Sequence, residues 1–246
     1  MITSAPRPVR ARLVERALAL RAYVAGQLTW PLRRVLFRGR IDARGARVPL
    51  SVWHRVRRTG FVRVGAGTEI EPGAIDAVQG RLELGPDCVL RRAERLRIWP
   101  NGVVRTGARC VIDTGARILV FGELHLGDDV YIGRDVVISV HEHVSIGSGT
   151  LLGERVSIHD ANHGPPEQRD AFRSQPVRIG ARAWIAAGVV LVAGAEVGAG
   201  TTVAANAAVA GRLPDDVLAG GVPARVIRCL ADDDRSRDSG DERTGA

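Results

Sequence analysis

The chain has 246 residues, and its 35 basic and 27 acidic residues leave a formal net charge of +8. All of the basic residues are arginine, so the sequence excludes chemistry that needs a lysine amine, such as a Schiff base or a P-loop. Hydrophobic residues make up 45% of the chain but aromatic residues only 4%, which favours a thin, regular repeat over a bulky globular core. No basic stripe is interleaved with aromatic residues, and we therefore expect no nucleic-acid partner.

The three cysteines, Cys88, Cys110 and Cys229, match no metal-binding or redox spacing. We expect each of them to be a small core residue in a reducing compartment. No run of about 18 or more apolar residues predicts a transmembrane helix. Charged residues interrupt any signal peptide near the N-terminus, so the sequence predicts a cytoplasmic protein.

Residues 1–45 stand apart from the rest of the chain. Within them, residues 8–29 have the spacing of an amphipathic helix, which Pro31 would end. Its apolar residues fall at helical intervals: Leu13, Ala17, Leu20, Val24 and Leu28. One interpretation is a helix that packs on the protein and caps one end. The other is peripheral contact with an anionic membrane at its inner face. We favour the first.

A six-residue repeat dominates the C-terminal half of the chain. An aliphatic residue recurs at fixed phase: Ile179, Ile185, Leu191, Val197, Val203 and Val209. The fourth residue after each of the first five is small or β-branched: Ala183, Val189, Ala195, Thr201 and Ala207. The same rhythm runs upstream in blocks shifted by two residues, from Leu126 to Ile138 and from Ile146 to Ile158, and in more degenerate turns back to Val64.

This period predicts an all-β fold, a parallel β-helix. Each six-residue unit would form a short strand and a sharp corner, and three units would close one triangular coil of about 18 residues. Because no coil buries its interior alone, several must stack with capped ends. We therefore expect the β-helix over residues 46–212, with ragged coils before Leu126, a C-terminal capping segment over 213–230 and a disordered tail over 231–246.

The repeat has one long break, between Ile158 and Ile179. The break is polar, contains prolines and begins with the sequence His159-Asp-Ala-Asn-His-Gly. A polar loop that leaves a regular scaffold is a common place for function. A histidine ordinarily titrates near neutrality and can act as a general base, which makes His163 a candidate. The alternative is an exposed loop histidine without a role.

Four features together resemble the hexapeptide-repeat acyltransferases, and most closely the maltose, galactoside and polysaccharide O-acetyltransferases. They are the aliphatic repeat, the Asp160-Ala-Asn-His163 loop, the segment from Pro176 to Ile185 that contains Trp184, and the ending Ala219-Gly-Gly-Val-Pro-Ala-Arg225-Val-Ile-Arg228. The resemblance is strong over residues 126–228 and rests on rhythm alone over 60–125. It implies a left-handed β-helix, a homotrimer with active sites between neighbouring prisms, acetyl-CoA as acyl donor and no bound metal.

The resemblance also implies roles for individual residues. His163 matches the catalytic base, which takes a proton from the acceptor hydroxyl, and Asp160 and Asn162 match neighbours that shape its loop. The residues that match the cofactor site are Trp184, Ala187, Ala205, Arg225 and Arg228. Arginine suits the CoA phosphates because its guanidinium can form two parallel hydrogen bonds. The family's frequent Thr-Lys pair reads Ala210-Gly211 here, so one CoA contact is absent.

The predicted reaction is acetyl transfer from acetyl-CoA to a hydroxyl of a sugar or glycan precursor. Two alternatives stay open. A γ-carbonic-anhydrase-like enzyme would bind a metal through three histidines of neighbouring coils, for which His125, His159 and His163 are spaced suggestively. A non-catalytic β-helix scaffold would bind no acetyl-CoA. His141 and His143 are expected on coil faces, where either could line the acceptor pocket.

Overall fold

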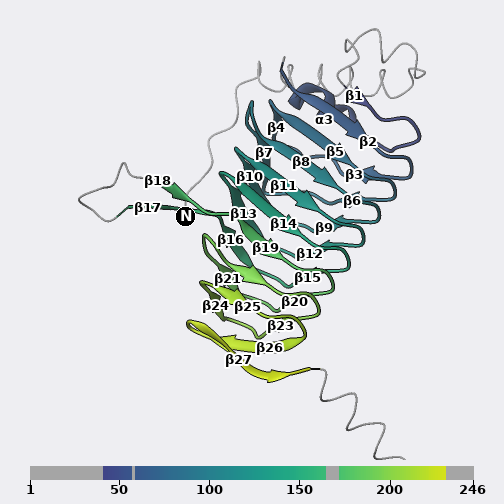
Figure 1. Ribbon diagram of the computed structural model, residues 1–246. Coiled ribbons are helices and arrows are strands. Elements are labelled where there is room, and N and C mark those ends of the chain that lie inside the picture. The colour runs from purple at the N-terminus through teal and green to yellow at the C-terminus, as the bar shows by residue number, and fades with distance from the viewer. Residues whose placement is uncertain (1–40, 57–58, 165–171, 231–246) are drawn as a thin grey trace, which may run out of the picture.

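The computed structural model describes residues 41–56, 59–164 and 172–230. Within these ranges the chain forms one column of stacked coils with a hairpin projecting from its side (Figure 1). The helix predicted over 8–29 and the tail predicted over 231–246 lie outside the described residues. In the described ranges, no helix is long and apolar enough to cross a membrane.

The coils form a parallel β-helix with three faces, each of which is a sheet built from strands of successive coils. The chain runs from face A to face B to face C and back to face A. This architecture is the all-β parallel β-helix that the six-residue period predicts.

The strands of face A are β1 (Ile41–Asp42), β2 (Phe61–Val64), β5 (Arg81–Leu84), β8 (Val103–Thr106), β11 (Glu123–Leu126), β14 (His143–Ile146), β19 (Val177–Ile179), β22 (Glu196–Val197) and β25 (Arg212–Leu213). Those of face B are β3 (Glu69–Ile70), β6 (Val89–Leu90), β9 (Val111–Ile112), β12 (Tyr131–Ile132), β15 (Leu151–Leu152), β20 (Trp184–Ile185), β23 (Thr202–Val203), β26 (Val217–Gly221) and β27 (Ala224–Cys229). Those of face C are β4 (Ala77–Val78), β7 (Arg95–Ile98), β10 (Arg117–Val120), β13 (Val137–Val140), β16 (Ser157–His159), β21 (Val190–Leu191) and β24 (Ala208–Val209).

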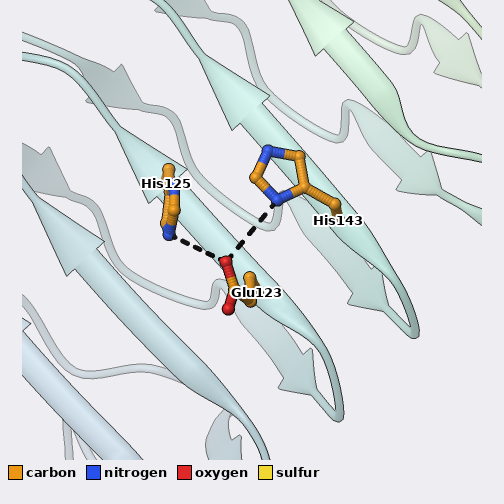
Figure 2. A group of neighbouring side chains, drawn as sticks. All are labelled: Glu123, His125 and His143. Atoms are coloured by element: carbon orange, nitrogen blue, oxygen red, sulfur yellow. Dashed lines mark ion pairs between the residues drawn. The ribbon is translucent and has the colours of Figure 1, made fainter.

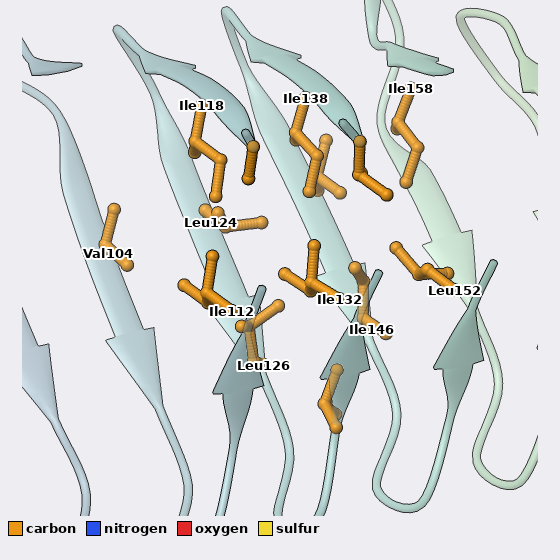
Figure 3. Close-up of a cluster of buried hydrophobic side chains, with 14 of the residues drawn as sticks. Val104, Ile112, Ile118, Leu124, Leu126, Ile132, Ile138, Ile146, Leu152 and Ile158 are labelled. Carbon is orange, nitrogen blue, oxygen red and sulfur yellow. The ribbon is translucent and has the colours of Figure 1, made fainter. Parts of the chain in front are cut away.

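Aliphatic side chains fill the interior of the column in register (Figure 3). Ile112, Ile132 and Leu152 are partners on neighbouring strands of face B, and all three are buried. The equivalent buried partners on face C are Ile118, Ile138 and Ile158. Each coil therefore adds one layer to a continuous core that no coil could form alone.

The small residues of the repeat are buried beside the corners, as predicted. Ala183, Val189, Ala195, Thr201 and Ala207 are each at most 1% exposed. The residue before each of them has a left-handed backbone, for example Gly194 with φ of 80° and Asn206 with φ of 58°. Glycine and asparagine adopt this conformation more readily than other residues, so they mark the sharp corners.

Coil length differs between the two halves of the column. From Ile179 to Val209 each coil consists of three six-residue units, as the pairing of Ile185 with Val203 shows, and the last coil is shorter, because Val197 pairs with Leu213. Before the hairpin a coil is longer by at least two residues, as the pairing of Ile112 with Ile132 shows. The extra residues lengthen the strands beside the corner between faces C and A, because β10 and β11 have four residues each whereas β21 and β22 have two. The prediction of three six-residue units per coil is therefore wrong for the first half.

The first coils are regular, in contrast to the expectation of ragged ones before Leu126. Val62, Leu82 and Val104 are partners on β2, β5 and β8, and each is at most 1% exposed. Parallel pairing begins at Ile41, which is the partner of Val62. The six-residue repeat looks degenerate there because successive coils are about 20 residues long, which is not a multiple of six.

Each end of the column carries an element that departs from the coil. Helix α3 (Leu50–Arg55) lies between β1 and β2. At the other end β26 and β27 pair antiparallel and extend face B. Because β27 is the outermost strand of that face, its Cys229 is exposed, whereas Cys88 and Cys110 are buried. The expectation of three core cysteines is wrong for Cys229.

Candidate functional site

The long break in the repeat forms a β-hairpin. Its strands β17 (Ala161–His163) and β18 (Phe172–Ser174) pair antiparallel, with Asn162 opposite Arg173 and His163 opposite Phe172. The hairpin follows β16 of face C and precedes β19 of face A, so it leaves the column at the corner between these faces. The structure thus places His163 and Asn162 together on the projecting element, where both are exposed.

Asp160 anchors the base of this hairpin. It is fully buried, and its carboxylate accepts backbone hydrogen bonds from the amides of His141 (2.7 Å), Glu142 (2.8 Å) and His143 (2.8 Å). Hydrogen bonds to an ionised carboxylate are stronger than those between neutral groups. Asp160 therefore ties the root of the hairpin to the same corner of the preceding coil, which is a positioning role.

A series of ring contacts leads from the coils to His163. Trp99 stacks on Phe121 with ring centroids 3.9 Å apart, and Phe121 stacks on His141 at 4.6 Å. The ring of His141 contacts Phe172 of the hairpin with centroids 4.5 Å apart, and the rings of Phe172 and His163 meet in a T-shaped arrangement with centroids 5.5 Å apart. We call these five residues the aromatic series. Its members Trp99, Phe121 and His141 lie on the coils and support the hairpin through Phe172, which positions the imidazole of His163.

Sequence reasoning missed Phe172 as part of the site and only suggested His141 for an acceptor pocket. The available signal was the single aromatic residue in a polar segment. His141 and Phe121 occupy matching corner positions one coil apart, and this alignment becomes visible only when the coil length is known. Neither position falls on the six-residue period.

His159 lies on the outer side of face C, at the end of β16. Its Nε2 is 2.8 Å from Oγ of Ser157, and the residue is half-buried. Burial holds the pKa of His159 below its usual value, because desolvation penalises the charged imidazolium. The side chain thus stays neutral near pH 7 and belongs to the scaffold next to the hairpin.

The residues predicted for the cofactor lie along face B and its corner with face C. Trp184 is on β20 and its side chain is 54% exposed. Ala187 and Ala205 occupy stacked turns at the corner, where the amide of Asn206 donates to the carbonyl of Ala187 over 3.0 Å. Arg225 and Arg228 are exposed on β27 at the end of the same face.

One chain does not bring the two predicted halves of the site together. The hairpin that carries His163 leaves the corner between faces C and A, whereas Trp184 is on face B, the side of the triangle that does not touch that corner. In Figure 1 the hairpin and β20 lie on opposite sides of the column. A site that uses both groups must therefore be shared between copies of the chain.

Face B also exposes apolar side chains in a row. Tyr131, Leu151 and Trp184 are partners on successive strands, and they are 37%, 47% and 54% exposed. Adjacent exposed apolar residues of this size are characteristic of a surface that another molecule covers. Trp184, at one end of this row, is also one of the predicted cofactor residues.

The three histidines considered for a carbonic-anhydrase-like metal site are not gathered. His125 is on β11 of face A, His159 is on β16 of face C and His163 is on the hairpin. The group of potential ligands that the described residues do bring together is Glu123, His125 and His143 on face A. It shares only His125 with the histidines that the sequence suggested.

Comparison with known proteins gives matches over part of the chain. Nodulation protein L of Rhizobium leguminosarum bv. viciae is 45% identical over 100 residues, which are 39% of this chain and 53% of that protein. WbbJ of Escherichia coli (strain K12), provisionally named a lipopolysaccharide biosynthesis O-acetyl transferase, is 32% identical over 112 residues, which are 40% of this chain and 57% of that protein. Galactoside O-acetyltransferase of the same organism is 30% identical over 96 residues, which are 37% of this chain and 47% of that enzyme.

This chain is similar to hexapeptide-repeat O-acetyltransferases. The matching region spans about half the length of the curated relatives. No family model matches the chain. Among solved structures, a galactoside acetyltransferase in complex with coenzyme A is 31% identical, with 44% of this chain and 58% of that chain covered and a TM-score of 0.39. The resemblance that the sequence motifs indicate is confirmed by the named relatives.

The anchoring role of Asp160 predicts a loss of stability. Asp160→Ala removes the buried carboxylate that three amides share, and the free energy of unfolding should fall by about 3 kcal/mol. Denaturant unfolding measures this, and hydrogen exchange of the amides of residues 141–143 should accelerate. The control is Asp128→Ala, which removes an exposed acceptor of the Ala108 amide and should cost about 1 kcal/mol or less. Equal losses in the two variants would contradict the anchor.

Proposed function

We propose that the protein is an acetyl-CoA-dependent O-acetyltransferase that modifies a hydroxyl of a sugar or glycan precursor. The observation that carries the proposal is the exposed imidazole of His163 on a hairpin that Asp160 and the aromatic series hold in place. Two of the named relatives are O-acetyltransferases, one of galactosides and one, provisionally, of lipopolysaccharide biosynthesis, which supports this choice of acceptor.

The proposed reaction is a direct transfer in which His163 acts as general base. His163 accepts the proton of the acceptor hydroxyl while the hydroxyl oxygen attacks the carbonyl carbon of the thioester. The carbon–sulfur bond then breaks, and the thiolate takes the proton from the imidazolium. The products are the acetylated acceptor and CoA with a free thiol. This sequence needs no acyl-enzyme and no metal.

The residues along face B fit a CoA molecule. The exposed indole of Trp184 offers an apolar surface for the pantetheine arm. Ala187 and Ala205 themselves carry only methyl groups, which leaves their backbone accessible to a ligand. The exposed Arg225 and Arg228 offer guanidinium groups to the phosphates.

We further propose that the chain forms a homotrimer of left-handed β-helices. Three-fold assembly would place the hairpin of one copy against face B of its neighbour and so complete three equal sites. The exposed row Tyr131, Leu151 and Trp184 supports this arrangement, because a trimer would cover part of it. Asn162, the neighbour of His163 in β17, would then shape the loop that presents the imidazole to the acceptor.

A cytoplasmic location and contact of residues 1–45 with the inner face of the membrane are proposals drawn from the sequence. The terminal helix predicted there is amphipathic and rich in arginine, a composition that suits an anionic surface. Cell fractionation of the full chain beside a chain that lacks residues 1–45 separates membrane contact from packing on the trimer.

Removal of the proposed base should abolish most of the activity without changing the fold. His163→Ala should lower kcat by about 10²–10⁴-fold, the usual contribution of a general base. Acetyl-CoA affinity should persist, because the exposed imidazole is not among the groups assigned to the cofactor. Thiol release measures the rate and calorimetry the affinity. Arg173→Ala, which alters an exposed side chain on the same hairpin, should retain its activity. Full activity of His163→Ala would exclude the assigned role.

The shared site predicts complementation between two inactive variants. His163→Ala and Trp184→Ala are each expected to be impaired, but mixed trimers contain interfaces with an intact hairpin and an intact face B. In each mixed trimer about one of the three sites should be complete. Co-expression with two different affinity tags isolates the mixed trimers for assay. If the site lay within a single chain, the mixed protein would be no more active than its inactive parents.

A further inference from the structure

A carboxylate and two imidazoles converge on the outer side of face A (Figure 2). Glu123 and His125 belong to β11 and are two residues apart, so both side chains point outward. His143 of β14 is the direct partner of Glu123 on the neighbouring coil. The three side chains therefore meet across one pair of strands.

The distances within this cluster suit a common ion. Oε2 of Glu123 is 3.4 Å from Nε2 of His125 and 3.9 Å from Nδ1 of His143. One ligand atom from each residue lies within 4.8 Å of the other two. A tetrahedral Zn²⁺ with bonds of about 2.0–2.2 Å holds its ligand atoms roughly 3.3–3.6 Å apart, so only small side-chain rotations separate the observed geometry from a bound one.

The backbone beneath the cluster is fixed. Strands β11 and β14 pair over four successive residues in the middle of the column. The amide of His143 also donates to the buried carboxylate of Asp160, which fixes the start of β14. A site with such support needs little reorganisation to bind a metal, because the strands already hold the ligands on one face.

Arg105, the partner of His125 on the preceding strand β8, opposes metal binding. Its Nη1 is 3.3 Å from Nε2 of His125, and its Nε is 3.2 Å from Oε2 of Glu83. The guanidinium thus competes for the lone pair that His125 would offer to a metal. The pairing with Glu83 offsets part of its positive charge and gives Arg105 a second partner when His125 turns away.

We propose that Glu123, His125 and His143 bind a first-row divalent transition metal, with Zn²⁺ the ion that best matches two imidazoles and one carboxylate. The ion links two successive coils beside the corner that carries the hairpin. Three protein ligands leave further coordination positions to solvent. This site is separate from the proposed acetyl transfer and from the histidines that the sequence suggested for a metal.

The test is calorimetric titration of the full chain, free of any polyhistidine tag and treated with chelator, with ZnCl₂. Wild-type protein should bind one Zn²⁺ per chain at this cluster. His125→Ala, His143→Ala and Glu123→Gln should each weaken binding at least about 10-fold, since loss of an outer-shell partner alone typically costs 10–100-fold. Arg105→Gln should bind Zn²⁺ more tightly than wild type. Glu142→Gln, an exposed neighbour outside the cluster, should bind as wild type does.

The melting temperature gives a second measure of binding. Zn²⁺ that binds only the folded chain should raise the melting temperature of wild type, but not that of the double variant His125→Ala/His143→Ala. Circular dichroism shows that each variant is folded. The proposal is overturned if wild type shows no saturable binding below about 1 mM Zn²⁺. It is equally overturned if the double variant binds Zn²⁺ as tightly as wild type, which would place the ion elsewhere, for example at the exposed Cys229.

Discussion

The in-register stacking of interior aliphatic residues is the constraint on which this structure depends. Ile118, Ile138 and Ile158 must lie above one another, since a shift of one residue would turn each side chain from the core to solvent. Additional residues therefore enter either as pairs that lengthen the strands beside a corner or as a segment that leaves the sheets at a corner. The column uses this freedom in two ways: the longer coils before the hairpin and the hairpin itself, both at the corner between faces C and A.

These two departures depend on each other. The longer corner of the preceding coil contains His141 and Glu142, whose amides bind the carboxylate of Asp160. The ring of His141 also contacts Phe172 of the hairpin. The hairpin is thereby tied to the column by hydrogen bonds at its root and by a ring contact at β18. This combination is what a general base needs, because a proton acceptor must be held within hydrogen-bond reach of its donor.

The fold was predictable because the six-residue period is unbroken from Ile179 to Val209. Six aliphatic positions from Ile179 onward imply coils, and their small companions imply corners. The first half appeared ragged because its coils are longer than three six-residue units, so that a search at the six-residue period loses phase at every coil. The position of His163 in an insertion was also readable. The contacts of Asp160 and Phe172 were not, because they join residues whose proximity depends on how successive coils stack. The separation of Trp184 from the hairpin likewise follows only from the order of the three faces.

A structure of the protein with CoA, determined by crystallography or electron microscopy, tests the central claim most directly. The account predicts that CoA lies between two copies, with its pantetheine arm beside Trp184 of one copy and its thiol near His163 of the other. It predicts the same arrangement three times around a three-fold axis. CoA bound wholly within one chain, or with its thiol remote from every His163, would contradict the shared site and the role assigned to that histidine.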